Sequence, residues 1–121
     1  MPTDRNAYLY TKGTDAAMDT EFAAARKYGK IRLGETFLFW RTALRNYAIP
    51  LNQVQRARRG IQSVAGRLCA GGRNFDIEYL VLTLHDGSEL QLHIGDDVKE
   101  KAVALLEDLK QSHPELEYGK E

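Results

Sequence analysis

The dipeptide Asp86-Gly87 lies between two segments of alternating leucines, and it constrains the fold more than any other feature of the sequence. Asp-Gly is a strong signal for a tight turn between antiparallel strands. A two-residue loop would set the leucines of one strand opposite polar residues of the other. A three-residue loop, which adds His85 and places Gly87 in the left-handed conformation, sets Leu82 opposite Leu90. This register gives one apolar face, so the sequence predicts an antiparallel hairpin with the three-residue loop.

This hairpin, over residues 76–94, is expected to end an antiparallel β meander that spans residues 30–95. After Gly29 the hydrophobic period changes from helical to alternating, which is typical of strands. Earlier strands of the meander are predicted at residues 31–33, 36–40, 44–49 and 53–62.

The second of these strands is apolar on both faces. Alternation directs Phe37 and Phe39 to one face and Leu38 and Trp40 to the other. One of the two sets could therefore lie outside the core, where an exposed group of that size would mark a partner surface.

Residues 52–69 allow two interpretations. Four apolar residues of this stretch would also share one side of a helix: Val54, Ile61, Val64 and Leu68. Gly60 and Gly66 favour a strand, because each glycine in a helix interior costs about 1 kcal/mol relative to alanine. We expect a strand, followed by a loop rich in small residues.

Helices are predicted on both sides of the meander. The first is expected over residues 15–28, with Thr14 or Asp15 at its start and Gly29 as its terminating residue. It would form an N-terminal strand and helix extension over residues 1–29.

The C-terminal helix is predicted over residues 97–112, with Asp96 or Asp97 as its cap and Glu100 completing a capping box. Its expected buried stripe consists of Val98, Ala102, Leu105, Leu106 and Leu109. With a capping helix at 96–113 and a tail at 114–121, the chain of 121 residues fits a single domain of the α+β class.

Five segments together resemble a known family. They are Gly34 with residues 36–40, residues 47–54, the Asp86-Gly87 turn, the leucines of the C-terminal helix, and residues 114–119. In their order they resemble the pleckstrin-homology-like (PH-like) domains, and in particular small bacterial members whose biochemical role is not established. The resemblance implies a bent, partly open antiparallel β-barrel closed by the C-terminal helix, here with an extra N-terminal helix. It also implies a non-catalytic binding or assembly module.

The resemblance bears on one ligand class directly. Phosphoinositide-binding members place several Lys and Arg residues around the loop that joins their first two strands. In this chain that loop is predicted at Gly34-Glu35, with Lys30 and Arg32 before it and an acid inside it. The sequence therefore argues against phosphoinositide as a partner.

Basic and acidic residues are separated along the chain. Residues 30–73 carry nine basic side chains and one acid, which gives +8, and residues 74–121 carry twelve acids and four lysines, which gives −8. Opposite patches on two copies would attract each other, and salt would weaken the attraction. We therefore expect a protein partner or self-association.

The basic segment contains the candidate ligand-binding residues, which are Arg56, Arg58, Arg59, Arg67 and Arg73. Guanidinium groups can hold carboxylate or phosphate with two hydrogen bonds. On a strand, Arg56 and Arg58 share one face and Arg59 takes the other. Two interpretations stay open. The arginines could bind an anionic ligand or an acidic protein surface, or they could be a solvated face that answers the acidic C-terminal helix of the same or a neighbouring copy.

Other functional classes find little support in the sequence. The glycine-rich residues 66–73 lack the Lys-Ser/Thr pair of phosphate loops, and the three histidines lack carboxylates or cysteines at ligand spacing. Cys69 is alone, and Phe75 is the only aromatic residue near the arginines, which argues against nucleic acid. No catalytic arrangement, metal site or cofactor is predicted. We expect neither a transmembrane segment nor a leader, and hence a cytoplasmic location.

Overall fold

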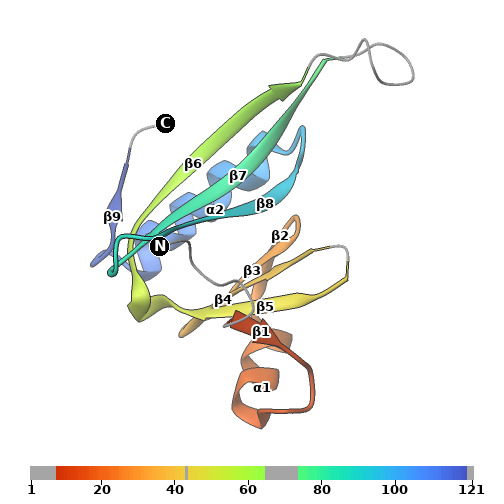
Figure 1. Ribbon diagram of the computed structural model, residues 1–121, viewed down its shortest axis with the longest axis vertical. Helices are drawn as coiled ribbons and strands as arrows, with labels where there is room; N and C mark the ends of the chain where they lie inside the picture. Colours follow the sequence, from red (N-terminus) through yellow and green to blue (C-terminus); the bar gives the residue numbers. More distant parts are fainter. Residues whose placement is uncertain (1–7, 43, 65–73, 120–121) are drawn as a thin grey trace.

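The computed structural model describes residues 8–42, 44–64 and 74–119. Within these residues the chain is an α+β protein with two α-helices and two sheets, neither of which closes into a barrel (Figure 1). The first sheet contains β1 (Leu9–Tyr10), β2 (Arg26–Tyr28), β3 (Ile31–Leu33), β4 (Phe37–Arg41) and β5 (Asn46–Pro50). The second contains β6 (Val54–Val64), β7 (Phe75–Leu84), β8 (Glu89–Asp96) and β9 (Glu117–Tyr118). The helices are α1 (Ala16–Ala24) and α2 (Lys99–Ser112), and a 3₁₀ turn, η2 (Leu51–Gln53), joins β5 to β6.

The strand order is β1-β5-β4-β3-β2 in the first sheet and β8-β7-β6-β9 in the second. All neighbours pair antiparallel except β6 and β9, which pair in parallel. The predicted antiparallel pairing of successive strands is therefore confirmed from β3 to β5 and from β6 to β8. The single continuous meander is wrong, because β5 and β6 lie in different sheets. The two sheets also contact each other where the Lys30 N–H donates to the Ile94 carbonyl oxygen at 2.9 Å.

The β7–β8 hairpin has the register predicted from the sequence. Leu82 pairs with Leu90, and Gly87 adopts a positive φ of 89°. The loop has three residues, because the Leu84 N–H donates to the Ser88 carbonyl oxygen at 2.8 Å. The leucines of both strands consequently lie buried on one face.

The ambiguous stretch forms strand β6 from residue 54 to residue 64, so the helical alternative is wrong there. Each residue from Arg56 to Val64 pairs with a residue of β7. The predicted loop of small residues falls on residues 65–73, which lie outside the described part of the chain.

The N-terminal helix is shorter than predicted. Asp15 caps it, because its Oδ1 accepts the Met18 N–H at 3.1 Å, but α1 ends at Ala24. Residues 26–28 form strand β2 instead, and the two-residue turn Gly29-Lys30 connects β2 to β3. The role of Gly29 as helix terminator is therefore wrong. Its φ of 58° places it at the first central position of a hairpin turn, where glycine avoids the strain of a side chain.

The predicted caps of the C-terminal helix are also wrong. α2 begins at Lys99 after Val98, which makes no side-chain capping hydrogen bond. Asp97 instead prolongs the pairing between β7 and β8. Its N–H donates to the Asp76 carbonyl oxygen at 2.7 Å, and its Oδ1 accepts the Asp76 N–H at 2.9 Å. The carboxylate is thus held at the sheet and does not cap the helix.

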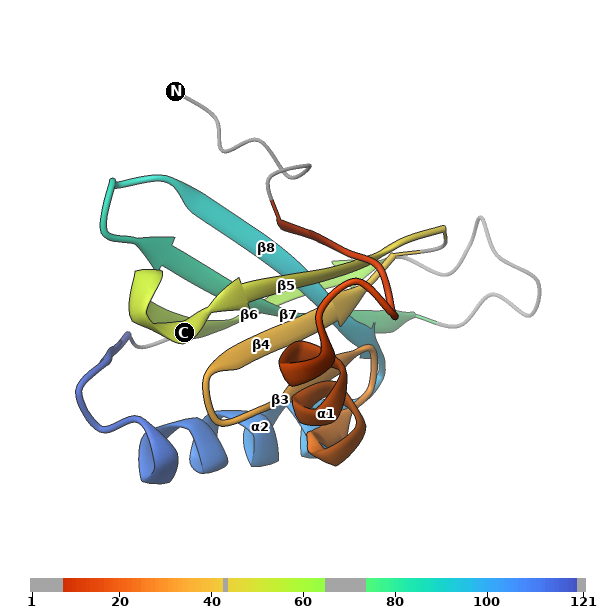
Figure 2. The ribbon, with the colours of Figure 1, turned by 90° about the horizontal axis from the view of Figure 1, so that it is seen from below.

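The main core lies between the two sheets and α2. Figure 2 shows α2 beside the strands of both sheets, and its Ala102, Leu105 and Leu109 belong to the buried cluster that contains Leu38 and Leu82. The predicted stripe is confirmed, with its other two members packed partly buried against the cluster. Each leucine buried in this way contributes roughly 1.5–3 kcal/mol. Within the described residues, no helix is long and apolar enough to cross a membrane.

Strand β4 separates this core from a second apolar cluster, as its alternation predicts. Leu38 and Trp40 face the main core, whereas Phe39 faces the second cluster. The other members of the second cluster are Tyr10, Ala48, Met18, Phe22, Ala25 and Phe37. Because α1 contributes Met18 and Phe22, this face of β4 is covered and is not an open partner surface.

The tight contact between the sheets at Gly29 predicts a large effect of a small substitution. A Cβ at Gly29 would overlap the Ile94 carbonyl oxygen, in addition to the strain of a positive φ. Gly87→Ala is the matched control, because Gly87 also has a positive φ but no atom lies within 4 Å of its added Cβ. In urea unfolding, Gly87→Ala is expected to lower the free energy of unfolding by about 1–2 kcal/mol, and Gly29→Ala by clearly more. Equal losses would contradict the contact.

Candidate functional site

Arg59, one of the five arginines selected from the sequence, is buried in an ion pair with Glu78 of β7. Their side chains are 7% and 2% exposed. Arg59 Nε donates to Oε1 of Glu78 at 2.7 Å, and Nη2 donates to Oε2 at 3.0 Å. The bidentate contact that the sequence suggests for a ligand is therefore made here by a carboxylate of the same chain.

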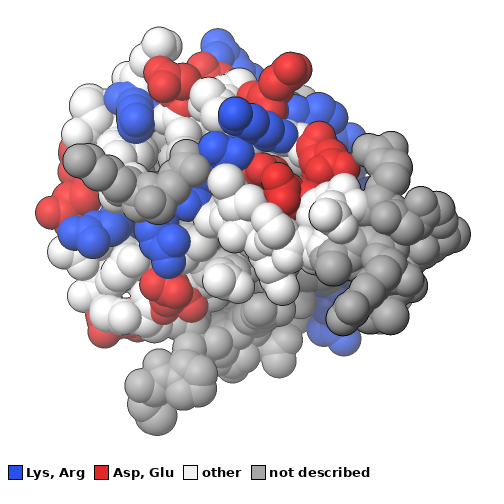
Figure 3. Space-filling view, turned by 90° about the horizontal axis from the view of Figure 1, so that it is seen from above, with Lys and Arg blue, Asp and Glu red and all other residues white. Residues whose placement is uncertain are grey.

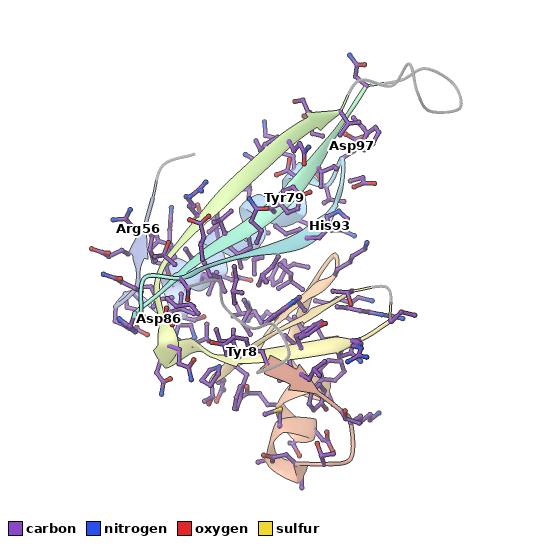
Figure 4. The ribbon with its side chains drawn as sticks, viewed as in Figure 1. Tyr8, Arg56, Tyr79, Asp86, His93 and Asp97 are labelled. Atoms are coloured by element: carbon purple, nitrogen blue, oxygen red, sulfur yellow. The ribbon has the colours of Figure 1, made fainter. Side chains whose placement is uncertain are left out.

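Arg56 and Arg58 lie on the opposite face of β6 from Arg59, as the alternation predicts. Arg56 Nη2 lies 3.7 Å from Oε2 of Glu117 in β9, and Figure 4 shows Arg56 beside that strand. Both side chains are more than half exposed, and such pairs contribute at most about 1 kcal/mol. Arg67 and Arg73 lie outside the described residues.

The fold brings the basic and acidic segments of the chain together. Both pairs just described join residues of the basic segment to residues of the acidic segment within one molecule. Figure 3 shows the consequence on one face, where basic and acidic side chains lie next to one another. Among the described residues, part of the charge separation is thus used inside the chain, through ion pairs of β6 with β7 and β9. Self-association stays a prediction.

A cationic groove lies elsewhere, on the first sheet. This hollow of about 510 Å³ is lined by residues of α1, by β2, β3, β4 and β5, and by the turns beside these strands. Its basic lining residues are Lys27, Lys30, Arg32 and Arg41. Its neutral lining residues are Phe22, Gly29, Phe39, Trp40, Thr42 and Asn46. None of these described lining residues is acidic, so the hollow favours an anion.

Two features of the backbone bring these cations together. The turn at Gly29-Lys30 sets Lys27 directly opposite Arg32 on the neighbouring strand. At the end of β4, the Arg41 N–H donates to the Lys30 carbonyl oxygen at 3.1 Å. Like charges directly opposite each other on neighbouring strands are destabilising, so this arrangement carries an electrostatic cost.

Helix α1 forms one wall of the cationic groove and holds Arg32. Arg32 Nη1 donates to the Phe22 carbonyl oxygen at 3.2 Å, and its Cζ lies 4.2 Å from the centre of the Phe22 ring. The preceding Glu21 fixes the helix to the turn between β3 and β4. Its carboxylate accepts the N–H groups of Thr36 and Phe37 at 3.0 and 2.7 Å. Arg32 is therefore oriented before any ligand arrives.

A second hollow of about 400 Å³ adjoins the groove and reaches the second sheet. It shares Lys30, Trp40, Arg41 and Thr42 with the first and adds Tyr79, Gln91 and His93. His93 Nδ1 lies 3.2 Å from Lys30 Nζ, and His93 Nε2 lies 3.2 Å from Oδ1 of Asp96. An ammonium must donate, so Nδ1 accepts from Lys30 and Nε2–H donates to Asp96. Figure 4 shows Tyr79 and His93 on the adjacent strands β7 and β8.

A third hollow, of about 640 Å³, lies between α1 and the end of α2. Its charged lining residues are Arg26 and two acids, Glu21 and Glu35. This mixture does not select an anion. The cationic groove is therefore the stronger candidate for a binding site.

The cationic groove was not predicted from the sequence. Extending the first helix to residue 28 places Lys27 on a helix and hides the turn after it. The loop at Gly34-Glu35 is the second turn of the sheet. The first turn is Gly29-Lys30, and the pair Lys27 and Arg32 lies close to it on β2 and β3. The signal that could have revealed it is the Gly-X pair Gly29-Lys30 between two short segments.

Comparisons of this chain with protein-family models, curated proteins and solved structures found no match.

The buried ion pair predicts a strongly non-additive mutational cycle. Arg59→Met alone is expected to lower the free energy of unfolding by about 3–5 kcal/mol, because it leaves the Glu78 carboxylate buried without its partner. Glu78→Met should have a similar effect. The double variant is expected to recover most of the loss, and denaturant unfolding of all four proteins measures the coupling. Additive losses would contradict a paired, buried arrangement.

Proposed function

We propose that the protein is a non-catalytic binding module and that its cationic groove binds an anionic ligand. The observation that carries this proposal is the direct pairing of Lys27 with Arg32 beside two further cations, with no acid among the described lining residues. A bound phosphate or carboxylate would offset the repulsion between the paired cations through charge-assisted hydrogen bonds.

The environment of Arg32 supports the proposal. Its side chain is half-buried between the Phe22 ring and the groove, so its interaction with a bound anion is screened less than that of a fully exposed cation. The guanidinium uses one of its N–H groups on the Phe22 carbonyl oxygen. Arg41 is exposed at the rim and can adjust to the ligand.

For the scaffold we propose a PH-like domain. The order of the strands from β2 to β8 and the packing of α2 against both sheets support this assignment. The acidic loop at Gly34-Glu35, which disfavours phosphoinositide, is not the first loop of the sheet, because the turn at Gly29-Lys30 precedes it. An inositol trisphosphate therefore belongs among the probes.

Inorganic pyrophosphate is expected to raise the melting temperature of the protein at low salt. A ligand at about 100 times its Kd stabilises the folded state by about 2.7 kcal/mol, which corresponds to several degrees. Arg41→Glu is expected to abolish the shift, because it reverses a charge at the rim of the cationic groove. Differential scanning calorimetry measures both proteins, and high salt should reduce the wild-type shift.

Arg58→Glu is the matched control. It reverses the charge of an arginine on β6 that does not line the groove, and it should leave the shift unchanged. If Arg58→Glu abolishes the shift and Arg41→Glu retains it, the ligand binds the arginines of β6 and the groove is not the site. If no phosphate, polycarboxylate or inositol trisphosphate shifts the melting temperature of the wild type, the proposed function is wrong.

A further inference from the structure

We infer that the ligand of the cationic groove carries at least two linked anionic groups, one on each side of a ridge formed by Lys30 and Arg41. The inference rests on the proposed function and specifies its ligand class. That class is a linear phosphate chain of two or more groups, either free or as part of a nucleotide.

Two hollows are adjacent at this site. The groove of about 510 Å³ and the hollow of about 400 Å³ share Lys30, Trp40, Arg41 and Thr42 as lining residues. The ridge between them is fixed by the backbone, because the Arg41 N–H donates to the Lys30 carbonyl oxygen. A ligand that lies across this ridge can therefore contact both hollows without a rearrangement of the strands.

The cations of the site are divided between the two hollows. Lys27 and Arg32 line only the first hollow, whereas Arg41 borders both. The Lys30 ammonium is drawn to the second hollow, since its Nζ lies 3.2 Å from Nδ1 of His93, which lines that hollow alone. The first hollow thus contains Lys27 and Arg32, the second contains the Lys30 ammonium, and both are bordered by Arg41.

Contacts with Asp96 and Tyr79 orient the ring of His93. Its Nε2–H donates to Oδ1 of Asp96 at 3.2 Å, and its ring lies 5.7 Å from that of Tyr79, centre to centre. Asp96 accepts this hydrogen bond but does not line either hollow. His93 therefore holds the Lys30 ammonium in place, and Thr42 and Gln91 add neutral donors in the second hollow.

A single phosphate can occupy only one side of the ridge and leaves the other cations without an anion. Two linked phosphates engage both sides, and the second group binds at the high effective concentration that the linkage provides. The loss of translational and rotational freedom is incurred once for both groups. A longer phosphate chain should therefore bind this site more tightly than the total charge of the ligand alone predicts.

Two charge-matched variants test the inference. Isothermal titration calorimetry gives the affinities of orthophosphate, pyrophosphate and tripolyphosphate for the wild type, Lys27→Gln and Lys30→Gln. Lys27→Gln is expected to weaken orthophosphate and pyrophosphate by similar factors. Lys30→Gln is expected to weaken pyrophosphate more, so that its advantage over orthophosphate falls about tenfold. His93→Ala, which removes the acceptor that orients Lys30, should change this ratio in the same direction.

The outcomes separate this inference from the function on which it rests. Binding of no phosphate at all rejects this inference, and the proposed function is overturned as well only if no polycarboxylate or inositol trisphosphate binds either. If pyrophosphate binds the wild type no tighter than orthophosphate, or if both lysine variants change the ratio equally, anion binding stands and the two-group ligand is rejected. Lys101→Gln on α2, which removes the same charge outside the groove, should leave both affinities unchanged. A higher affinity for ADP than for pyrophosphate indicates that the phosphate groups of the ligand belong to a nucleotide. A lower affinity for ADP indicates that the ligand is a free polyphosphate.

Discussion

The backbone hydrogen bond from the Lys30 N–H to the Ile94 carbonyl oxygen is the contact on which the candidate site depends. It joins the turn between β2 and β3 to strand β8, and Gly29 lies against the same carbonyl group so closely that a side chain would not fit. The contact brings Lys30 close to the second sheet, where its Nζ lies 3.2 Å from Nδ1 of His93. The cationic groove and the adjoining hollow are neighbours for this reason, because their shared wall lies where the sheets meet.

The sequence was sufficient where the determining pattern is local and strong. The hairpin register follows from Asp86-Gly87 and its leucines, and the two faces of β4 follow from the alternation of Phe37 to Trp40. The sequence was insufficient at residues 26–28, where the helical pattern of the preceding residues concealed a three-residue strand. A strand this short is stabilised by its neighbour in the sheet, so its own residues carry a weak signal. The caps proposed for α2 failed for a similar reason, since Asp97 pairs with the distant Asp76.

The arginines of β6 show why a candidate site is harder to predict than a fold. Their residue type and spacing are suited to an anion, but the burial of Arg59 and its partner Glu78 are properties of the folded chain. The cations of the groove are spread over three strands, and only the turn at Gly29-Lys30 sets Lys27 opposite Arg32. The linear separation of charge likewise did not specify two surfaces, because two ion pairs join the segments within one molecule.

The central claim is that an anion binds beside the turn between β2 and β3. The most direct measurement is a titration of the isotopically labelled protein with pyrophosphate, followed by NMR of the backbone amides. The account predicts saturable shifts concentrated at Gly29, Lys30, Arg32, Arg41 and Thr42. Shifts confined to the arginines of β6, or no saturable shift at any amide, would contradict it.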